Sequence, residues 1–257
     1  MEHVHTTTVI PTLADNYTYV LKCDGEAVAI DPGEASPVLR RLRVSGSSLR
    51  AVLCTHRHFD HTSGNEELAR VTGCELHIAP GLSESNPAGV VGETFSLQAG
   101  PFRFDVIPTP GHSEDSVCYY LPPSYGSAGE VFTGDTLFVG SCGRLFTHSP
   151  EAMWASFRRL ALLPPETLVY CGHDYSLENY EFAVTVEPDN EAVRRRLEEM
   201  RALAEAAELT VPSTMAQECA TNPFLRVSEP GLKRALGMPD APDVDVFTEL
   251  RRRKDRF

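Results

Sequence analysis

Residues 55–61 read THRHFDH and follow directly on the apolar run LRAVLC of residues 49–54. An aliphatic run that ends in such a polar cluster predicts a buried strand that opens into a loop. His56 and His58 stand two positions apart, so on an extended chain their side chains point the same way and can reach one ion. Asp60 and His61 follow a bend and can aim at a second point nearby. Because imidazole and carboxylate suit zinc, iron or manganese, we expect a metal site here rather than a solvated loop.

The composition describes a soluble, acidic protein. The chain has 257 residues, 42% of them hydrophobic, which suffices for one large domain or a medium domain with an appendage. The formal net charge of −13 speaks against nucleic acid as the main partner. No apolar run approaches the roughly 20 residues of a membrane helix, and the first residues resemble neither a signal nor a transit peptide. We expect a cytoplasmic protein with no membrane partner, and nothing in the sequence demands more than a monomer.

The cysteines and the basic residues each form a pattern. The seven cysteines are spread along the chain without a Cys-x-x-Cys pair, which fits reduced thiols. Cys54 adjoins the histidine cluster, and we expect it to be buried by packing rather than to bind metal.

Residues 251–256 read RRRKDR. This basic end is either a helix terminus stabilised by the helix dipole or a seat for an anionic ligand.

The hydrophobic pattern predicts strands interleaved with helices, and then helices alone. Strands are predicted at 4–10, 16–22, 26–30, 50–54, 74–78, 102–107, 117–121, 130–133 and 167–170. Helices are predicted at 37–44, 63–70, from Ser149 onward, 191–208, 230–236 and 244–254. Residues 80–92 are predicted to form an exposed loop, and no strand is expected after residue 176. This order predicts an α/β body followed by a small helical domain.

Three further candidate ligands stand apart from the first cluster. His112, Asp135 and His173 each follow a β-type run and a turn that contains glycine. Strand ends at one edge of a sheet are where such a site is normally assembled. Two metal ions that share a bridging carboxylate would use all the candidates. The full set is His56, His58, Asp60, His61, His112, Asp135 and His173.

The histidine string and the three later ligands, at these spacings, resemble the metallo-β-lactamase superfamily. Within it, the chain is most similar to glyoxalase II, the hydroxyacylglutathione hydrolase family. The matching strings are DNYTY at 15–19, AIDPG at 29–33, TPGHS at 109–113, FTGDTLF at 132–138, VYCGHDY at 169–175, TNPFLR at 221–226 and RRRKD at 251–255. The histidine string identifies only the superfamily, whereas the tail with its basic end points to this family.

The resemblance implies an α/β fold, a four-layer αββα sandwich of two stacked sheets between outer helices. Residues 1–174 would form the catalytic domain and residues 175–257 a small all-helical glutathione-binding domain. Two divalent metal ions are implied, zinc or alternatively iron or manganese. One ion would be held by His56, His58 and His112, the other by Asp60, His61 and His173, with Asp135 bridging them.

The resemblance also implies where glutathione binds. The matching positions are Arg144, Phe146, Tyr175, Arg251 and Lys254. Two of them depart from the family pattern, which has Lys and Tyr where this chain has Arg144 and Phe146. Arginine keeps the charge of lysine but not its geometry. Phe146 has no hydroxyl, so the hydrogen bond that the family makes from this position is absent.

The implied reaction is thioester hydrolysis. S-D-lactoylglutathione and other S-2-hydroxyacylglutathiones would be converted to D-lactate and glutathione, the second step of methylglyoxal detoxification. A metal-bridging hydroxide would attack the carbonyl carbon, and Asp60 and Asp135 are the candidate catalytic residues. Asp60 would orient the hydroxide or take up its proton.

Three alternatives accompany this interpretation. The first is an iron-dependent glutathione persulfide dioxygenase of the same superfamily, which shares His56, His112 and Asp135 but lacks the long basic tail. The second is a nuclease of the same fold, which the net charge disfavours. The third is a catalytically silent metal-binding protein, which the complete ligand set disfavours.

Overall fold

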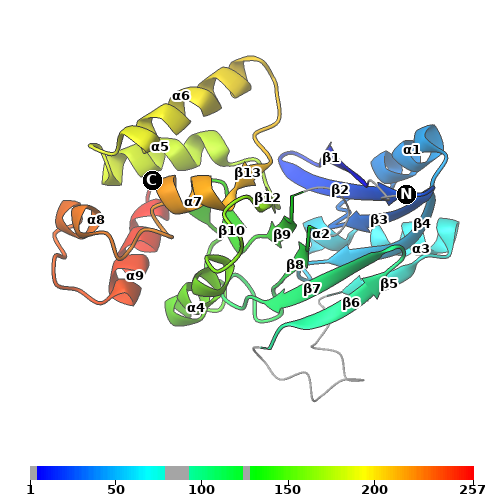
Figure 1. Cartoon of the computed structure of the whole chain (residues 1–257), viewed down its shortest axis with the longest axis horizontal. Coiled ribbons are helices and arrows are strands. Elements are labelled where there is room, and N and C mark those ends of the chain that lie inside the picture. Colours follow the sequence, from blue (N-terminus) through cyan, green and yellow to red (C-terminus); the bar gives the residue numbers. More distant parts are fainter. Residues whose placement is uncertain (1–4, 79–92, 124–127) are drawn as a thin grey trace. The chain divides into compact units, whose positions relative to one another are not determined.

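The computed structural model describes residues 5–78, 93–123 and 128–257. The chain divides into two compact units (Figure 1). Unit 1 contains residues 1–108 and 115–134, and unit 2 contains residues 109–114 and 135–257. The loop predicted at 80–92 lies outside the described residues, and the domain boundary at residue 174 stays a prediction. Within the described ranges, no helix is long and apolar enough to cross a membrane.

Unit 1 consists of two sheets with helices in the connections of the first. Its elements are β1 (Thr6–Thr12), β2 (Asn16–Cys23), β3 (Glu26–Ile30), α1 (Ala35–Ser45), β4 (Ser48–Cys54), α2 (Phe59–Thr62), α3 (Asn65–Thr72), β5 (Glu75–Ile78), β6 (Phe95–Ala99), β7 (Phe102–Pro108), β8 (Val117–Leu121) and β9 (Glu130–Gly134). The first sheet has the order β1-β2-β3-β4-β5, with antiparallel pairing up to β3 and parallel pairing beyond it. Strands β6 to β9 pair antiparallel in succession.

Strand β4 is buried because both of its faces are covered. On one face, Val52 packs in a core cluster with Val38 and Leu42 of α1 and residues of α3. Toward the second sheet, the hydroxyl of Tyr119 in β8 donates a hydrogen bond of 3.0 Å to the Cys54 carbonyl. Residues 51–54 are therefore buried on both faces, as expected of a central parallel strand. Its carboxyl end, where the histidine cluster begins, is held in place.

Unit 2 is mostly helical. Its elements are β10 (Leu137–Phe138), β11 (Ser141–Cys142), α4 (Pro150–Leu160), β12 (Leu168–Cys171), α5 (Ser176–Val186), α6 (Glu191–Glu205), β13 (Ser213–Thr214), α7 (Met215–Thr221), α8 (Pro230–Ala235) and α9 (Asp243–Lys254). Strands β10 and β11 form a short hairpin, and β12 pairs antiparallel with β13. Helix α4 begins as predicted, because the Ser149 side chain accepts a hydrogen bond from the Ala152 amide and Pro150 follows it.

The predicted strands and helices in the described residues are present, with ends shifted by a few residues. The expectation of no strand after residue 176 is wrong, since β13 pairs with Leu168 and Val169. A two-residue strand carries no alternating pattern that a sequence can reveal. Helix α5 was not predicted, because its apolar residues are not confined to one face.

Helix α6 offers a test of its N-terminus. The side-chain oxygen of Asn190 accepts hydrogen bonds from the Ala192 and Val193 amides, at 3.0 and 3.3 Å. Replacing Asn190 with Ala should lower the free energy of unfolding by about 1 kcal/mol, because these amides lose their cap. Urea denaturation followed by circular dichroism measures this. Asn190→Ser keeps an acceptor and should stay near the wild type; equal losses in both variants would contradict the assignment.

Candidate functional site

In unit 1, the four predicted ligands form two pairs, which we call the unit 1 ligand cluster. His56 and His58 lie on the link between β4 and α2, with His56 Nε2 3.0 Å from His58 Nδ1. Helix α2 supplies the bend that the sequence predicted, and His61 Nε2 lies 3.5 Å from Asp60 Oδ2. Two ligand atoms about 2.1 Å from one tetrahedral zinc ion lie roughly 3.4 Å apart. Each pair therefore has the spacing of two ligands on one ion.

Asp31 directly follows β3 and was not among the predicted site residues, yet its side chain contacts the unit 1 ligand cluster. Its carboxylate accepts hydrogen bonds from the Thr55 amide and the Thr55 hydroxyl, both at 2.7 Å. The same carboxylate lies 3.1 Å from His61 Nδ1, and the Thr55 hydroxyl lies 3.1 Å from His56 Nδ1. These contacts leave Nε2 of both imidazoles facing the other ligands. The signal was the string at 29–33, where an acidic residue ends a buried strand.

Two neighbours complete this cluster. Asn16 donates a hydrogen bond of 2.9 Å from Nδ2 to the Asp60 carboxylate and so fixes its direction. Cys54 is buried as predicted, and its thiol donates to the His61 carbonyl and contacts Asn65. Burial raises the pKa of the Cys54 thiol well above its usual range. A neutral thiol is a poor metal ligand, which fits the packing role.

In unit 2, one carboxylate oxygen faces two imidazoles. Asp135 Oδ2 lies 3.5 Å from His112 Nε2 and 3.3 Å from His173 Nε2. His112 Nδ1 donates a 2.9 Å hydrogen bond to the Arg144 carbonyl, which fixes the tautomer and directs Nε2 toward Asp135. Gly143 packs so closely that a Cβ atom there would lie 1.9 Å from the Asp135 carbonyl oxygen. A shared carboxylate between two histidines is the donor arrangement that a bridging ligand requires.

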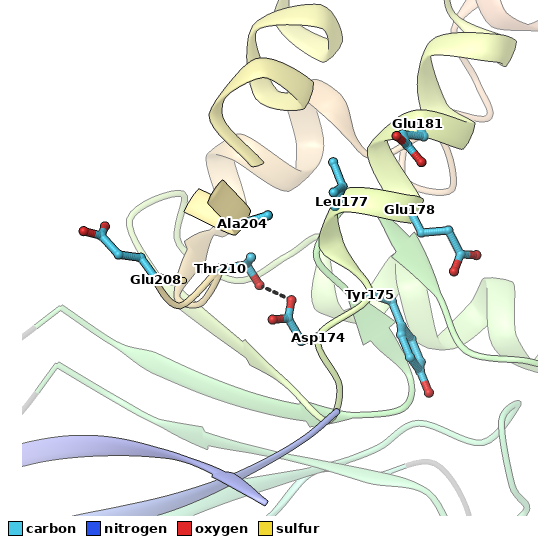
Figure 2. Close-up of a pocket in the computed structure, with 8 residues that line it drawn as sticks. All are labelled: Asp174, Tyr175, Leu177, Glu178, Glu181, Ala204, Glu208 and Thr210. Carbon is cyan, nitrogen blue, oxygen red and sulfur yellow. Dashed lines mark hydrogen bonds between the residues drawn. The ribbon is translucent and has the colours of Figure 1, made fainter. Parts of the chain in front are cut away.

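An acidic pocket of about 340 Å³ lies beside the start of α5 (Figure 2). Its lining includes the carboxylates of Asp174, Glu178, Glu181 and Glu208, and neither Lys nor Arg is among the described residues that line it. Asp174 accepts a hydrogen bond of 2.7 Å from Thr210. Because like charges repel, this pocket disfavours an anionic ligand.

Tyr175 also lines this acidic pocket, but its ring points away from Glu181 (Figure 2). The Tyr175 ring stacks on His173, with ring centres 5.0 Å apart and planes inclined by 5°. Phe138 packs edge-on against both rings. The structure therefore places Tyr175 next to a predicted metal ligand.

A second pocket, of about 640 Å³, carries basic residues, and we call it the basic pocket. Its lining consists of Arg144, Leu145, Phe146, His148, Pro150, Thr248, Arg251, Arg252 and Asp255. Three of the five predicted glutathione contacts are thus brought together. The Arg144 side chain is exposed and makes no hydrogen bond or ion pair with any residue that the structure describes. The Phe146 ring is edge-on to His112, with centres 5.2 Å apart.

Arg251 and Lys254 are buried and already have partners. Arg251 donates a 2.8 Å hydrogen bond to the Cys142 carbonyl and forms an ion pair of 2.9 Å with Asp255. Lys254 forms an ion pair with Glu178. The other cations of α9 behave similarly, since Arg252 and Arg253 bind Glu249 and hold the pKa of its carboxyl at about 2. Four of the five cations at the basic end therefore pair with carboxylates.

Comparisons with known proteins agree with these features. The model of the metallo-beta-lactamase superfamily matches residues 12–173, and the model described as hydroxyacylglutathione hydrolase C-terminus matches residues 174–257. The chain is 44% identical over 254 residues to the hydroxyacylglutathione hydrolase of Methylococcus capsulatus, covering 96% of this chain and 97% of that protein.

Solved structures are similar as well. ETHE1 from Myxococcus xanthus has a TM-score of 0.64 at 25% identity, covering 96% of this chain and 90% of that chain. TTHA1623 in a di-iron-bound form has a TM-score of 0.55 at 28% identity, covering 86% of this chain and 100% of that one. These similarities confirm the predicted fold class, an α/β sandwich of the metallo-β-lactamase type followed by helices.

The contacts of Asp31 yield a test by metal binding. Asp31→Asn should weaken zinc binding by about 10- to 100-fold, because the amide cannot accept from Thr55 and orient His61 at once. Competition with a chromophoric chelator measures the affinity. Asp24→Asn is the matched control, since Asp24 and Asp31 both have φ of 49° and Asp24 lies in an exposed turn. Wild-type affinity in Asp31→Asn would remove Asp31 from the metal site.

Proposed function

Because this chain belongs to the hydroxyacylglutathione hydrolase family of the metallo-β-lactamase superfamily, we propose that it hydrolyses the thioester bond of S-D-lactoylglutathione and other S-2-hydroxyacylglutathiones. The products are a 2-hydroxy acid and glutathione. The observation that carries the proposal is the match of the C-terminal family model to residues 174–257. The superfamily fold at residues 12–173 does not by itself select a reaction.

The seven predicted ligands are proposed to form one centre for two divalent metal ions. One set consists of His56, His58 and His112, the other of Asp60, His61 and His173, with Asp135 shared. The spacings within each unit support this, because every neighbouring pair of donor atoms described above lies 3.0 to 3.5 Å apart. When bound, the ions would lower the pKa of a coordinated water toward neutrality and stabilise negative charge on the thioester oxygen.

Asp60 is proposed to orient the attacking water and to accept its proton. Its side chain is partly exposed, while Asn16 holds one of its carboxylate oxygens. A carboxylate held in this way can orient a water molecule and accept its proton. The leaving group is the thiolate of glutathione. Because its thiol has a pKa of about 8.5, the thiolate can leave without a general acid.

The basic pocket is proposed to bind the anionic tripeptide. Arg144 is the one cation of this pocket with no partner in the described ranges, so it gains a new ion pair when a carboxylate arrives. Arg251 and Lys254 would instead exchange Asp255 and Glu178 for carboxylates of glutathione, or share them. Tyr175 would supply its hydroxyl, and Phe146 an apolar contact in place of the hydrogen bond of the family.

The first experiment is steady-state hydrolysis of S-D-lactoylglutathione, with the metal content measured on the same preparation. We expect activity with about two metal ions per chain, lost on chelation and restored by added zinc. We expect two ions because the seven predicted ligands provide three for each ion and one that both ions share. An absence of hydrolysis, together with one iron per chain and oxygen uptake in the presence of glutathione persulfide, would assign the chain to the dioxygenase alternative.

Arg144 separates substrate binding from chemistry. Arg144→Ala should raise KM about tenfold, the loss of one charge-assisted hydrogen bond, and should change kcat much less. Arg144→Lys keeps the charge and should recover part of the loss. Arg158→Ala removes an exposed arginine of α4 that does not line the pocket and should leave KM unchanged. An unchanged KM in Arg144→Ala would move the substrate site elsewhere.

A further inference from the structure

All three predicted metal ligands of unit 2 depend on one short stretch, residues 135–144, which we call the hairpin segment. Asp135 is its first residue. At its other end, the carbonyl of Arg144 accepts the hydrogen bond from His112. Between these ends, the Phe138 ring packs edge-on against His173, with centres 5.9 Å apart. The segment therefore contains one of the three predicted ligands and contacts the other two.

The helical part of unit 2 holds this segment by its main chain. Asn222 donates from Nδ2 to the carbonyls of Phe138 and Ser141, at 3.2 and 3.0 Å. Glu218 accepts a 2.9 Å hydrogen bond from the Gly140 amide. Main-chain groups buried without a partner would cost free energy, and these two side chains supply the partners. Asn179 of α5 is a third such residue, with a 3.0 Å hydrogen bond to the Val139 carbonyl.

Gly140 makes the turn of the segment possible. Its φ is 77°, in the left-handed region, and a Cβ atom there would lie 3.0 Å from the Tyr180 ring. The turn is therefore pressed against α5, and its amide is directed at Glu218. A residue with a side chain at this position would disturb both contacts.

Glu218 and Asn222 act as one buried unit. Asn222 Nδ2 donates to Glu218 Oε2 at 3.0 Å, and Ser213 donates to Glu218 Oε1 at 2.6 Å. Both side chains are fully buried at 0% exposure. Helix α7 presents them one turn apart, and the Thr214 capping box fixes its start. Burial raises the pKa of the Glu218 carboxyl. A buried carboxyl group costs more stability than an apolar side chain unless donors surround it, and here Ser213, Gly140 and Asn222 supply them.

We propose that Glu218 and Asn222 are positioning residues for the metal centre, acting on Asp135, His112 and His173 through the hairpin segment. The C-terminal helices would thus serve the metal ligands in addition to carrying substrate contacts. This inference rests on the metal centre of the proposed function. It assigns a role to the TNPFLR string at 221–226, which neither the ligand set nor the glutathione contacts explain.

The test compares metal binding in Glu218→Ala and Asn222→Ala with the wild-type chain. Both variants should bind zinc about tenfold more weakly in chelator competition, since partners that orient ligands contribute on this scale. Cobalt substitution gives a second readout, because its visible absorption reports the ligand geometry and should change in both variants. Glu218→Gln keeps an acceptor oxygen for Gly140 and should restore most of the affinity.

Two controls separate positioning from general destabilisation. Ser213→Ala removes a hydrogen bond to Glu218 but no contact to the hairpin segment, and it should keep the cobalt spectrum. Val193→Ala opens the core at a buried position of α6 and should lower stability without changing the zinc affinity. Wild-type zinc affinity and spectrum in folded Glu218→Ala and Asn222→Ala would overturn the inference. An equal loss of affinity in Val193→Ala would overturn it too.

Two further outcomes are decisive. If an alanine variant does not fold, Asn222→Ser replaces it. Serine has one O–H donor, whereas the two N–H groups of Asn222 serve three acceptors, so the same weakening of zinc binding is expected. A wild-type chain that binds zinc but leaves S-D-lactoylglutathione intact would refute the reaction alone, and the zinc comparison would still decide the inference. A wild-type chain that binds no zinc, iron or manganese would overturn both.

Discussion

The buried carboxylate of Asp31 is the contact on which the unit 1 ligand cluster depends. It ends β3, accepts from the amide and hydroxyl of Thr55 at the end of β4, and faces His61. A carboxylate that is 2% exposed costs free energy unless such donors surround it. Through these hydrogen bonds, the Asp31 carboxylate links the ends of the parallel strands β3 and β4 to the loop that carries His61. The carboxylate contacts the His61 ring directly, and it holds the Thr55 hydroxyl that contacts the His56 ring.

Unit 2 fixes its imidazoles by a different means. There a main-chain carbonyl, that of Arg144, orients His112, and the carbonyl is in turn placed by the hairpin segment. A main-chain carbonyl keeps its direction only when the backbone on either side of it is held in place. That explains why buried polar side chains such as Glu218 and Asn222 gather behind a two-strand hairpin that has little core of its own. The predicted ligands of unit 1 therefore have a buried carboxylate beside them, whereas His112 of unit 2 has a main-chain carbonyl whose segment is held by hydrogen bonds from other side chains.

The sequence predicted the parts of this arrangement that are local. The apolar run before His56 marked β4, and the turns before His112, Asp135 and His173 marked the positions of the remaining predicted ligands. Asp31 was visible as a strand-end acid, but its partner Thr55 stands 24 positions later. The contact between Glu218 and Gly140 spans 78 positions, and no periodicity records such a pair. The ion pair of Lys254 with Glu178 was hidden for the same reason, while that of Arg251 with Asp255 followed the helical spacing.

These ion pairs change what the basic end contributes to substrate binding. A guanidinium or ammonium that exchanges one carboxylate for another gains little, because the charge was already paired and desolvated. Arg144 differs, since its side chain is exposed and would gain a partner in the proposed complex, although water would screen the new pair. The acidic pocket beside Glu178 repels the same ligand. In the proposed function, selectivity for an anionic tripeptide would arise from positive charge that is left uncompensated in an acidic chain, and the exposed side chain of Arg144 is such a charge.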